Sequence, residues 1–231
     1  MSETTTARPA PSLIVFDVNE TLSDMSPMAD RFAAVGAPPE LAQVWFAGLL
    51  RDGFALTAAG GVERFAVFAD GALRSVLSGR PLDRDLDAAV EHVLAGLPEL
   101  TVHPDVPDGV RGLRATGRRL VTLTNGPTST AERLLGSAGI DGEFERLLSV
   151  EDAGVWKPAA GAYRYAAETC GAAVSDMLLV AVHPWDIDGA ARAGLGTAWV
   201  NRTGAPYPPY FRPPQHTVTR LDELPAALDR G

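Results

Sequence analysis

The residues best placed to do chemistry follow a short apolar run near the start of the chain. The run Leu13–Phe16 is too short for a typical helix and is flanked by Pro11 and Ser12, which favours a strand buried on both faces. Asp17 comes directly after it. Ligands of open α/β sheets bind outside the carboxyl ends of the strands, so a carboxylate there is placed to act as a nucleophile or a metal ligand. An aspartate that only caps the next helix explains this stretch equally well when it is taken alone.

Polar residues also follow three later apolar runs, at the points where further strands are predicted to end. Because the carboxyl ends of parallel strands meet at one edge of a sheet, we expect these residues to lie near Asp17. The sequence therefore predicts one site built from four strand ends. The three later groups are Thr124, Asn125 and Gly126 after the run 119–123, Lys157 and Pro158 after the run 147–150, and His183, Trp185 and Asp186 after the run 177–182.

The chemistry expected of Asp17 depends on a neighbouring cation, and Lys157 is the candidate. An ammonium group keeps a nearby carboxylate ionised and stabilises charge during nucleophilic attack. A lysine considered alone is usually exposed, so this role depends on the other polar residues that are predicted to lie at the same sheet edge. Thr21 is placed to hydrogen-bond the nucleophile, and a turn or cap residue is the competing interpretation.

The second strand end offers groups that bind anions. The hydroxyl of Thr124, the amide of Asn125 and the backbone N–H of Gly126 precede a helix that is predicted to begin near Ser129. Such groups at a helix N-terminus can hold the carboxylate or phosphate of a substrate. A helix N-cap is the alternative, and the two roles are compatible.

The elements that must position these residues fall into two blocks. Residues 23–98 carry helical patterns and no convincing strand, whereas helices and strands alternate from Val106 onward. Alternation of this kind indicates a parallel sheet with helices on both faces. We therefore predict an α/β protein with a Rossmann-like core, 12–22 and 99–231, an inserted all-helical cap domain, 23–98, and a disordered lead-in, 1–11. The predicted helices are 28–35, 41–50, 62–77, 86–97, 106–116, 129–138, 160–169 and 186–193, and the later strands are 119–123, 147–150, 177–182 and 197–200.

Composition limits the partners that the chain can have. The chain has 231 residues, of which 46% are hydrophobic, and a formal net charge of -9. This acidic balance argues against nucleic acid or an anionic membrane as partner, because both require a basic surface. The single cysteine, Cys170, permits no intramolecular disulfide and favours the cytoplasm. No apolar run approaches the length that spans a membrane.

The order of these motifs along the chain resembles that of the haloacid dehalogenase superfamily. The resemblance rests on Asp17-x-x-x-Thr21, then Thr124-Asn125, then Lys157-Pro158, then an acidic loop, with a helical insertion after the first motif. It covers nearly the whole chain. It implies a Rossmann-like hydrolase core, Asp17 as the nucleophile and a small anionic substrate.

Two departures separate the chain from the phosphatases of that superfamily. Those enzymes carry a second Asp two residues after the nucleophile, which protonates the leaving oxygen, whereas this chain has Asn19. An amide cannot serve as a general acid. The fourth motif places Val182 where the phosphatases have a magnesium ligand, and Asp17 with Asp186 alone makes a poor site for that ion. We therefore expect neither a metal nor another cofactor.

The remaining features resemble the 2-haloacid dehalogenases of the superfamily. Halide leaves without being protonated, and attack at carbon needs no metal. The resemblance implies that Asp186 orients Lys157 or the hydrolytic water, and that Tyr163 lines the pocket, although a packing tyrosine is the alternative. His183 either positions water or is a satisfied loop residue. The matching residues are Asp17, Thr21, Thr124, Asn125, Lys157, Pro158, Tyr163, Trp185, Asp186 and the run Asn201-Arg202-Thr203-Gly204.

The cap departs from those dehalogenases at the residue that grips the anion. Their arginine directly follows a tryptophan, whereas here Trp45 is followed by Phe46. The best substitute is Arg51, with a solvated helix charge as the alternative. Phe46 and Phe54 are expected to shape the pocket and exclude water.

The resemblance implies hydrolytic dehalogenation of short 2-haloacids to 2-hydroxy acids, of the (S)-2-haloacid dehalogenase type. The reaction passes through an ester on Asp17 and needs no metal. The alternatives are a phosphatase or phosphonatase-like hydrolase with an atypical metal site and a non-catalytic anion-binding homologue. A homodimer is the possible assembly.

Overall fold

Six parallel strands form one sheet in the order β3-β2-β1-β4-β5-β6 in the computed structural model, which describes residues 10–230. The first strand is central because it pairs with β2 on one side and β4 on the other. The order reverses between β1 and β4, and such a switch point opens a crevice at the carboxyl ends of the strands. The strands are β1 Leu13–Phe16, β2 Arg119–Thr124, β3 Arg146–Ser149, β4 Met177–Ala181, β5 Gly196–Val200 and β6 His216–Val218.

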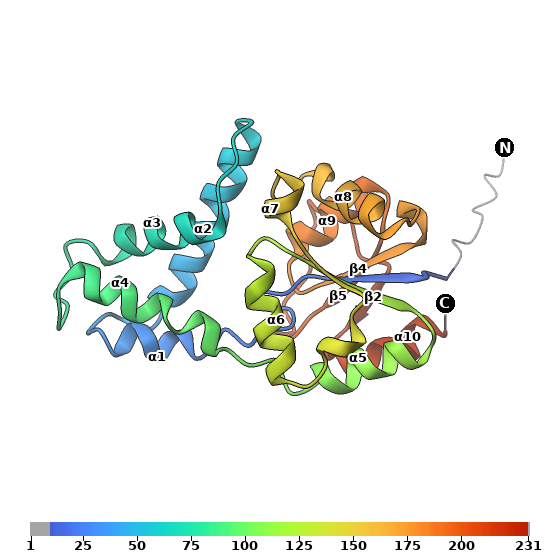
Figure 1. Cartoon of the computed structure of the whole chain (residues 1–231), viewed down its shortest axis with the longest axis horizontal. Coiled ribbons are helices and arrows are strands. Elements are labelled where there is room, and N and C mark those ends of the chain that lie inside the picture. Colours follow the sequence, from blue (N-terminus) through green and yellow to red (C-terminus); the bar gives the residue numbers. More distant parts are fainter. Residues whose placement is uncertain (1–9, 231) are drawn as a thin grey trace.

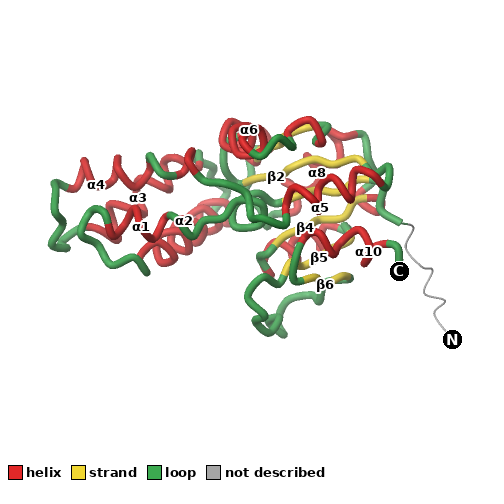
Figure 2. The backbone as a smooth tube through the Cα atoms, turned by 90° about the horizontal axis from the view of Figure 1, so that it is seen from below, coloured by secondary structure: helices red, strands yellow, loops and turns green. Residues whose placement is uncertain are grey.

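Helices cover both faces of this sheet, as Figures 1 and 2 show. Side chains of a strand alternate between faces, so Leu13 and Val15 join one buried cluster while Ile14 and Phe16 join the other. The apolar run at β1 is therefore buried on both sides, as its composition predicts. The helices of this body are α5 Val106–Ala115, α6 Thr128–Ser137, α7 Val150–Ala153, α8 Ala160–Cys170, α9 Pro184–Ala193 and α10 Leu224–Leu228.

The four remaining helices lie together at one end of the molecule (Figure 1). The chain passes between them and the α/β body twice, and the two passages run side by side, because Asp24 N–H donates to the Thr101 carbonyl at 2.8 Å. This crossing lies close to the predicted boundaries of the cap at residues 23 and 98, and the division into two domains at those residues stays a prediction. The helices are α1 Met28–Ala33, α2 Leu41–Ala58, α3 Phe65–Leu77 and α4 Leu86–Leu94.

Helix α2 is longer than its sequence pattern predicts. The pattern ends at Leu50, but the helix continues past Gly53 to Ala58. Gly53 faces the ring of Trp156 so closely that an added Cβ would lie 2.6 Å from it. Glycine is unfavourable in the middle of a helix, but at position 53 its missing side chain allows close contact between α2 and Trp156.

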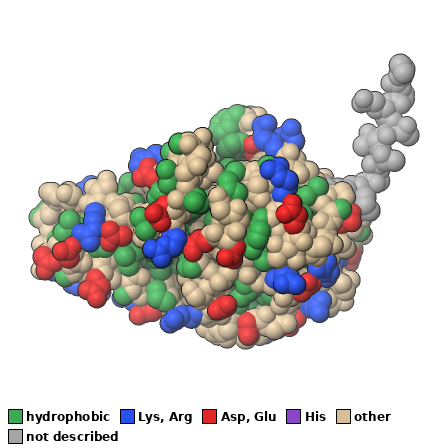
Figure 3. Space-filling model, turned by 45° about the horizontal axis from the view of Figure 1, so that its top comes forward, with side chains coloured by type: hydrophobic (Ala, Val, Ile, Leu, Met, Phe, Trp, Pro, Cys, Tyr) green, Lys and Arg blue, Asp and Glu red, His purple; other side chains and the backbone are tan. Residues whose placement is uncertain are grey.

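The surface carries charges of both signs. Figure 3 shows acidic and basic side chains interspersed over the face that it presents. Within residues 10–230, no helix combines the length and the apolar character that spanning a bilayer requires. Most of the predicted lead-in, residues 1–9, lies outside the described residues.

Candidate active site

The site begins with Asp17, whose position follows directly from the central strand. Its backbone N–H continues the pairing with β4 by donating to the Val180 carbonyl at 3.0 Å, and the residue is only 3% exposed. The Thr21 hydroxyl donates to Asp17 Oδ2 at 2.6 Å and accepts a hydrogen bond from the Val182 N–H at 3.0 Å. Thr21 therefore connects the Asp17 carboxylate to the end of β4.

Lys157 lies between two carboxylates. Its Nζ donates to Asp17 Oδ1 at 2.8 Å and to Asp186 Oδ2 at 2.6 Å, and its side chain is fully buried. The Asn125 side chain fixes the backbone of this residue, because Asn125 Oδ1 accepts a hydrogen bond from the Lys157 N–H at 3.0 Å. Lys157 is also the only lysine in a chain that otherwise uses arginine. The single lysine in the sequence was therefore an available indication that position 157 requires a compact ammonium group.

The second carboxylate is held by the lysine and by a buried tyrosine. The Tyr163 hydroxyl donates to Asp186 Oδ1 at 2.6 Å, so each oxygen of Asp186 already has a donor. Both side chains are fully buried. Tyr163 therefore fixes the orientation of the Asp186 carboxylate through this hydrogen bond.

Burial and charge act differently on the groups of this network. Burial alone raises the pKa of Asp17, but the Lys157 ammonium and His183 outweigh it, so that this pKa lies below its ordinary value. Burial raises the pKa of Asp186, and Lys157 offsets this only in part. For Lys157, burial lowers the pKa, but the two carboxylates reverse the effect and raise it. These surroundings therefore favour the ionised form of Asp17 more strongly than that of Asp186.

A histidine lies close to the Asp17 carboxylate, and a glutamate lies close to that histidine. His183 Nε2 lies 3.6 Å from Asp17 Oδ2, 3.6 Å from Glu20 Oε2 and 3.2 Å from the Asn19 carbonyl oxygen. Its ring stacks on Trp185 at 4.9 Å. Glu20 has φ of 61°, the only positive φ of a non-glycine residue among residues 10–230. Strain of this kind persists where the surroundings over-determine it.

Glu20 was missed by sequence reasoning because no pattern in the chain predicts its backbone conformation. Burial raises the pKa of its carboxyl, and His183 lowers it in part. The predicted polar role of His183 is consistent with these contacts.

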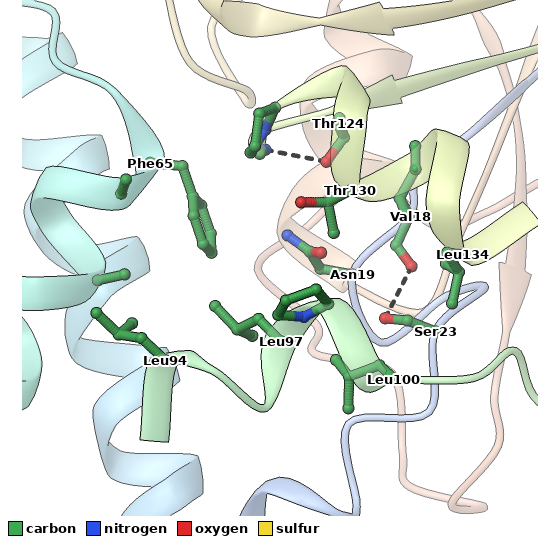
Figure 4. A pocket seen from close by; sticks show the side chains of 16 residues that line it. Val18, Asn19, Ser23, Phe65, Leu94, Leu97, Leu100, Thr124, Thr130 and Leu134 are labelled. Carbon is green, nitrogen blue, oxygen red and sulfur yellow. Dashed lines mark hydrogen bonds between the residues drawn. The ribbon is translucent and has the colours of Figure 1, made fainter. Parts of the chain in front are cut away.

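The end of β2 contributes the groups expected to bind an anion. Thr124 Oγ1 accepts a hydrogen bond from the Gly126 N–H at 2.9 Å, and α6 begins two residues later. The Asn19 amide nitrogen would lie 3.7 Å from a Cβ built on Gly126. These three residues line a cavity of about 240 Å³, which Figure 4 shows.

The cap helices contribute aromatic side chains. The Phe54 ring lies 4.8 Å from the Trp185 ring, whose centroid is 6.0 Å from Lys157 Nζ. Phe46 is buried against Trp45 and lines a second, larger cleft of about 820 Å³ that also contacts His183.

Arg51 does not join these residues in the structure. Its side chain is 75% exposed, and Nε donates to Asp52 Oδ1 at 2.8 Å. Helical periodicity turns Leu50 and Gly53 inward and leaves residue 51 on the outer face of α2. The assignment of Arg51 as the anion-binding residue therefore stays a prediction that this geometry does not support.

Trp156 joins the body to the cap helices, and sequence reasoning missed it. Its Nε1 donates to the Glu63 carbonyl at 3.0 Å, and its ring stacks on Phe65 at 6.3 Å and meets Phe68 edge-on at 5.0 Å. Its place directly before Lys157 was the available clue. Contact with the cap helices thus directly precedes the buried Lys157.

The donor set does not fit a magnesium ion. Magnesium requires near-octahedral oxygen ligation, yet both oxygens of Asp186 accept hydrogen bonds from Lys157 and Tyr163. Asp17 also accepts from Lys157 and Thr21. Among residues 10–230, no group of three or more His, Cys, Asp or Glu side chains is arranged to hold a metal ion.

Comparisons with known proteins identify the family of the chain. A family model described as haloacid dehalogenase-like hydrolase matches residues 11–194. Haloacetate dehalogenase H-2 of Moraxella sp. (strain B) is 30% identical, with 91% of this chain and 95% of that protein covered. The (S)-2-haloacid dehalogenase of Pseudomonas sp. (strain YL) is 31% identical, with 90% of each covered. The structure of L-2-haloacid dehalogenase from Xanthobacter autotrophicus with chloropropionic acid covalently bound superposes with a TM-score of 0.84 at 25% identity, covering 96% of this chain and 99% of that one.

Proposed function

This chain belongs to the haloacid dehalogenase-like hydrolases, and we propose that it hydrolyses (S)-2-haloacids to 2-hydroxy acids and halide. The observation that carries the proposal is the arrangement of Asp17 and Lys157: a buried carboxylate is held ionised by an ammonium group at 2.8 Å. Relatives over 90% or more of this chain are named as dehalogenases of haloacetate and (S)-2-haloacids.

The first step of the reaction is displacement at carbon. A carboxylate oxygen of Asp17 attacks C2 of the substrate, the carbon–halogen bond breaks, and the halide leaves with the bonding electrons. The product of this step is an ester between Asp17 and C2. The hydrogen bonds from Thr21 and Lys157 fix the direction of the carboxylate, so that little orientational freedom is lost at the moment of attack.

The second step is hydrolysis of that ester. Water attacks the carboxyl carbon of Asp17, and the bond from that carbon to the ester oxygen breaks. One proton of the water goes to that oxygen, which leaves as the hydroxyl of the 2-hydroxy acid, and the other is released to solvent as Asp17 returns to its carboxylate. His183 and Glu20 both line the larger cleft, and His183 Nε2 lies 3.6 Å from Asp17 Oδ2. In this proposal these two side chains orient the attacking water. Asp186 acts through Lys157, because it has no oxygen without a donor.

The substrate carboxylate needs donors near Asp17. We propose that the Asn19 amide and the Thr124 hydroxyl hold it at the entrance of the 240 Å³ cavity, beside the first turn of α6. Trp185 and Phe54 cover the site and limit the access of bulk water.

Release of halide tests this function. Purified protein is expected to release halide from (S)-2-chloropropionate in the presence of a metal chelator. Activity that appears only with magnesium, and on phosphate esters, would favour a phosphatase. Anions that protect the protein against thermal unfolding without any turnover would favour a binding protein.

Oxygen labelling tests the covalent intermediate. In a single turnover in heavy-oxygen water with enzyme in excess, the label is expected to enter Asp17 and not the 2-hydroxy acid. The reason is that the water oxygen is added to the Asp17 carboxyl carbon. Asp17→Asn keeps the size of the side chain but removes the nucleophilic charge, so it should abolish turnover in a folded protein. Label that goes directly into the product would contradict the mechanism.

The predicted homodimer and the cytoplasmic location belong to this proposal. Sedimentation of the purified protein tests the first, and cell fractionation the second.

A further inference from the structure

We propose that the cavity beside Asn19 receives an apolar substituent on C2 of the substrate. The preferred substrates are then 2-haloacids with a side chain of several carbons, which extends the expected range of short acids. This inference rests on the proposed function, because it concerns the same site.

The walls of the cavity come from both parts of the molecule. In Figure 4, Phe65 of α3 and Leu97, which follows α4, face Thr130 and Leu134 of α6 across the cavity. Most of the lining is apolar carbon, and the volume is about 240 Å³. Protein interiors contain few voids larger than a water molecule, so a space of this size is unlike ordinary packing. Apolar walls with a few convergent polar groups are typical of a ligand pocket.

One end of the cavity adjoins the nucleophile. Val18 and Asn19, the two residues after Asp17, both line it, and so do Thr124 and Gly126 at the end of β2. A Cβ built on Gly126 would lie 3.5 Å from Thr124 Oγ1, 3.7 Å from Asn19 Nδ2 and 3.9 Å from the Phe65 ring, so polar and apolar groups meet at this point. A substrate held there by its carboxylate has its C2 substituent beside the apolar walls.

The larger cleft fits an apolar substituent less well. Glu20, Asp24 and Glu40 line it together with His103 and His183. Burying an alkyl group there would desolvate charged side chains without pairing them. The cavity next to Asn19 and Thr124 thus has no charged side chain in its lining, whereas the larger cleft, although also partly apolar, includes charged groups next to His183.

The size of residue 19 decides how much of the cavity is open. Asn19 stands at the entrance, with its amide directed toward Phe65 in Figure 4. A larger side chain at this position would take up space that the short amide leaves to the substrate.

A series of acids tests this proposal. Burial of one methylene contributes about 0.8 kcal/mol, equivalent to about a fourfold gain in kcat/KM. We expect kcat/KM to rise by about this factor per methylene from (S)-2-chloropropionate to (S)-2-chlorohexanoate. Measurement of halide release for each acid gives the slope.

Two matched substitutions locate the substituent. Ala66 lies at the exposed rim of the cavity, so Ala66→Leu narrows it without disturbing the core. It is expected to lower the ratio of kcat/KM for 2-chlorohexanoate over 2-chloropropionate by about tenfold or more, since roughly two methylenes lose their place. Ala29 lines the larger cleft, and Ala29→Leu is expected to leave this ratio unchanged. Thermal unfolding of both variants checks that they are folded.

The outcomes separate this proposal from the proposed function. If 2-chloropropionate is turned over but the series is flat or falls with chain length, the cavity proposal is wrong and the function stands. A change of the ratio in Ala29→Leu but not in Ala66→Leu also overturns it. No turnover of any acid removes the proposed function, and this inference with it.

Discussion

Replacing Lys157 by methionine tests whether one ammonium group compensates two buried carboxylates. Methionine keeps the length of the side chain and removes its charge. In the native protein Nζ donates to Asp17 at 2.8 Å and to Asp186 at 2.6 Å, with all three side chains almost completely buried. The substitution therefore leaves two carboxylates in a site that excludes water.

The expected loss of stability follows from that burial. Removing one partner of a buried ion pair costs about 3–5 kcal/mol, because the remaining charge is neither hydrated nor paired. With a urea m-value of about 2 kcal/mol/M, the midpoint of unfolding falls by about 2 M. Dehalogenation is expected to fall by about 10²–10³ in kcat/KM, the usual loss when one electrostatic donor is removed from a site.

The loss should depend on pH in a definite direction. In the native protein the pKa of Asp17 is lowered, so its contribution to stability is fully present above the unfolded value of about 3.9 and is lost as pH falls through the folded value. Without Lys157, burial is opposed only by His183 and Thr21 at Asp17 and by Tyr163 at Asp186, so the pKa of each carboxyl is expected to rise. A carboxyl with a raised pKa destabilises the fold while it is ionised, so the difference between variant and native protein should shrink from pH 8 to pH 5.

Urea unfolding followed by tryptophan fluorescence at several pH values measures this difference. The matched control is Arg192→Met, which removes a half-exposed arginine from its ion pair with Asp188; Asp188 keeps its hydrogen bond from the Arg212 N–H, so the expected cost is less than about 1 kcal/mol. Adding Asp186→Asn to Lys157→Met removes one of the two unpaired charges and should restore about 0.5–3 kcal/mol. A loss in Lys157→Met as small and as independent of pH as that of the control would refute the reasoning.

Two further substitutions test the neighbours of this network. Tyr163→Phe removes the 2.6 Å hydrogen bond to Asp186, so the pKa of Asp186 should rise further and the acidic limb of the pH profile of kcat/KM should move to higher pH. Urea unfolding should show a loss of stability of about 1.5–3 kcal/mol. An unmoved limb would assign Tyr163 to packing alone. Arg51→Lys is expected to lose much activity if Arg51 grips the anion, because lysine lacks the planar fork, whereas Arg31→Lys should change little. Equal, small effects on halide release would place the anion at Asn19 and Thr124, which agrees better with the exposed position of Arg51.

Most of the secondary structure could be predicted from the sequence because it depends on local pattern. The apolar runs at β1, β2 and β4 and the helical periodicity of α8 lie within one or two residues of their predicted bounds. The positions of Asp17 and Asp186 near strand ends follow from the runs at β1 and β4, since the carboxyl ends of parallel strands share one edge. Lys157 lies further from its strand, because the short helix α7 separates it from β3. The order of these residues along the chain also carried the resemblance to the family.

The contacts that define the site were decided by tertiary packing. Lys157 forms a hydrogen bond with Asp17, 140 positions away in the sequence, and Trp156 forms one with Glu63, 93 positions away. A local sequence pattern predicts neither contact. The contact between Glu20 and His183 depends on the positive φ of Glu20, which no local pattern predicts. The outward direction of the Arg51 side chain depends on how α2 is rotated against the rest of the structure. The residue types and their order thus determined which chemistry is available, because strands, turns and charges are local properties. Packing decided which of those groups touch and where a cavity stays open, because both depend on how separate elements meet in space.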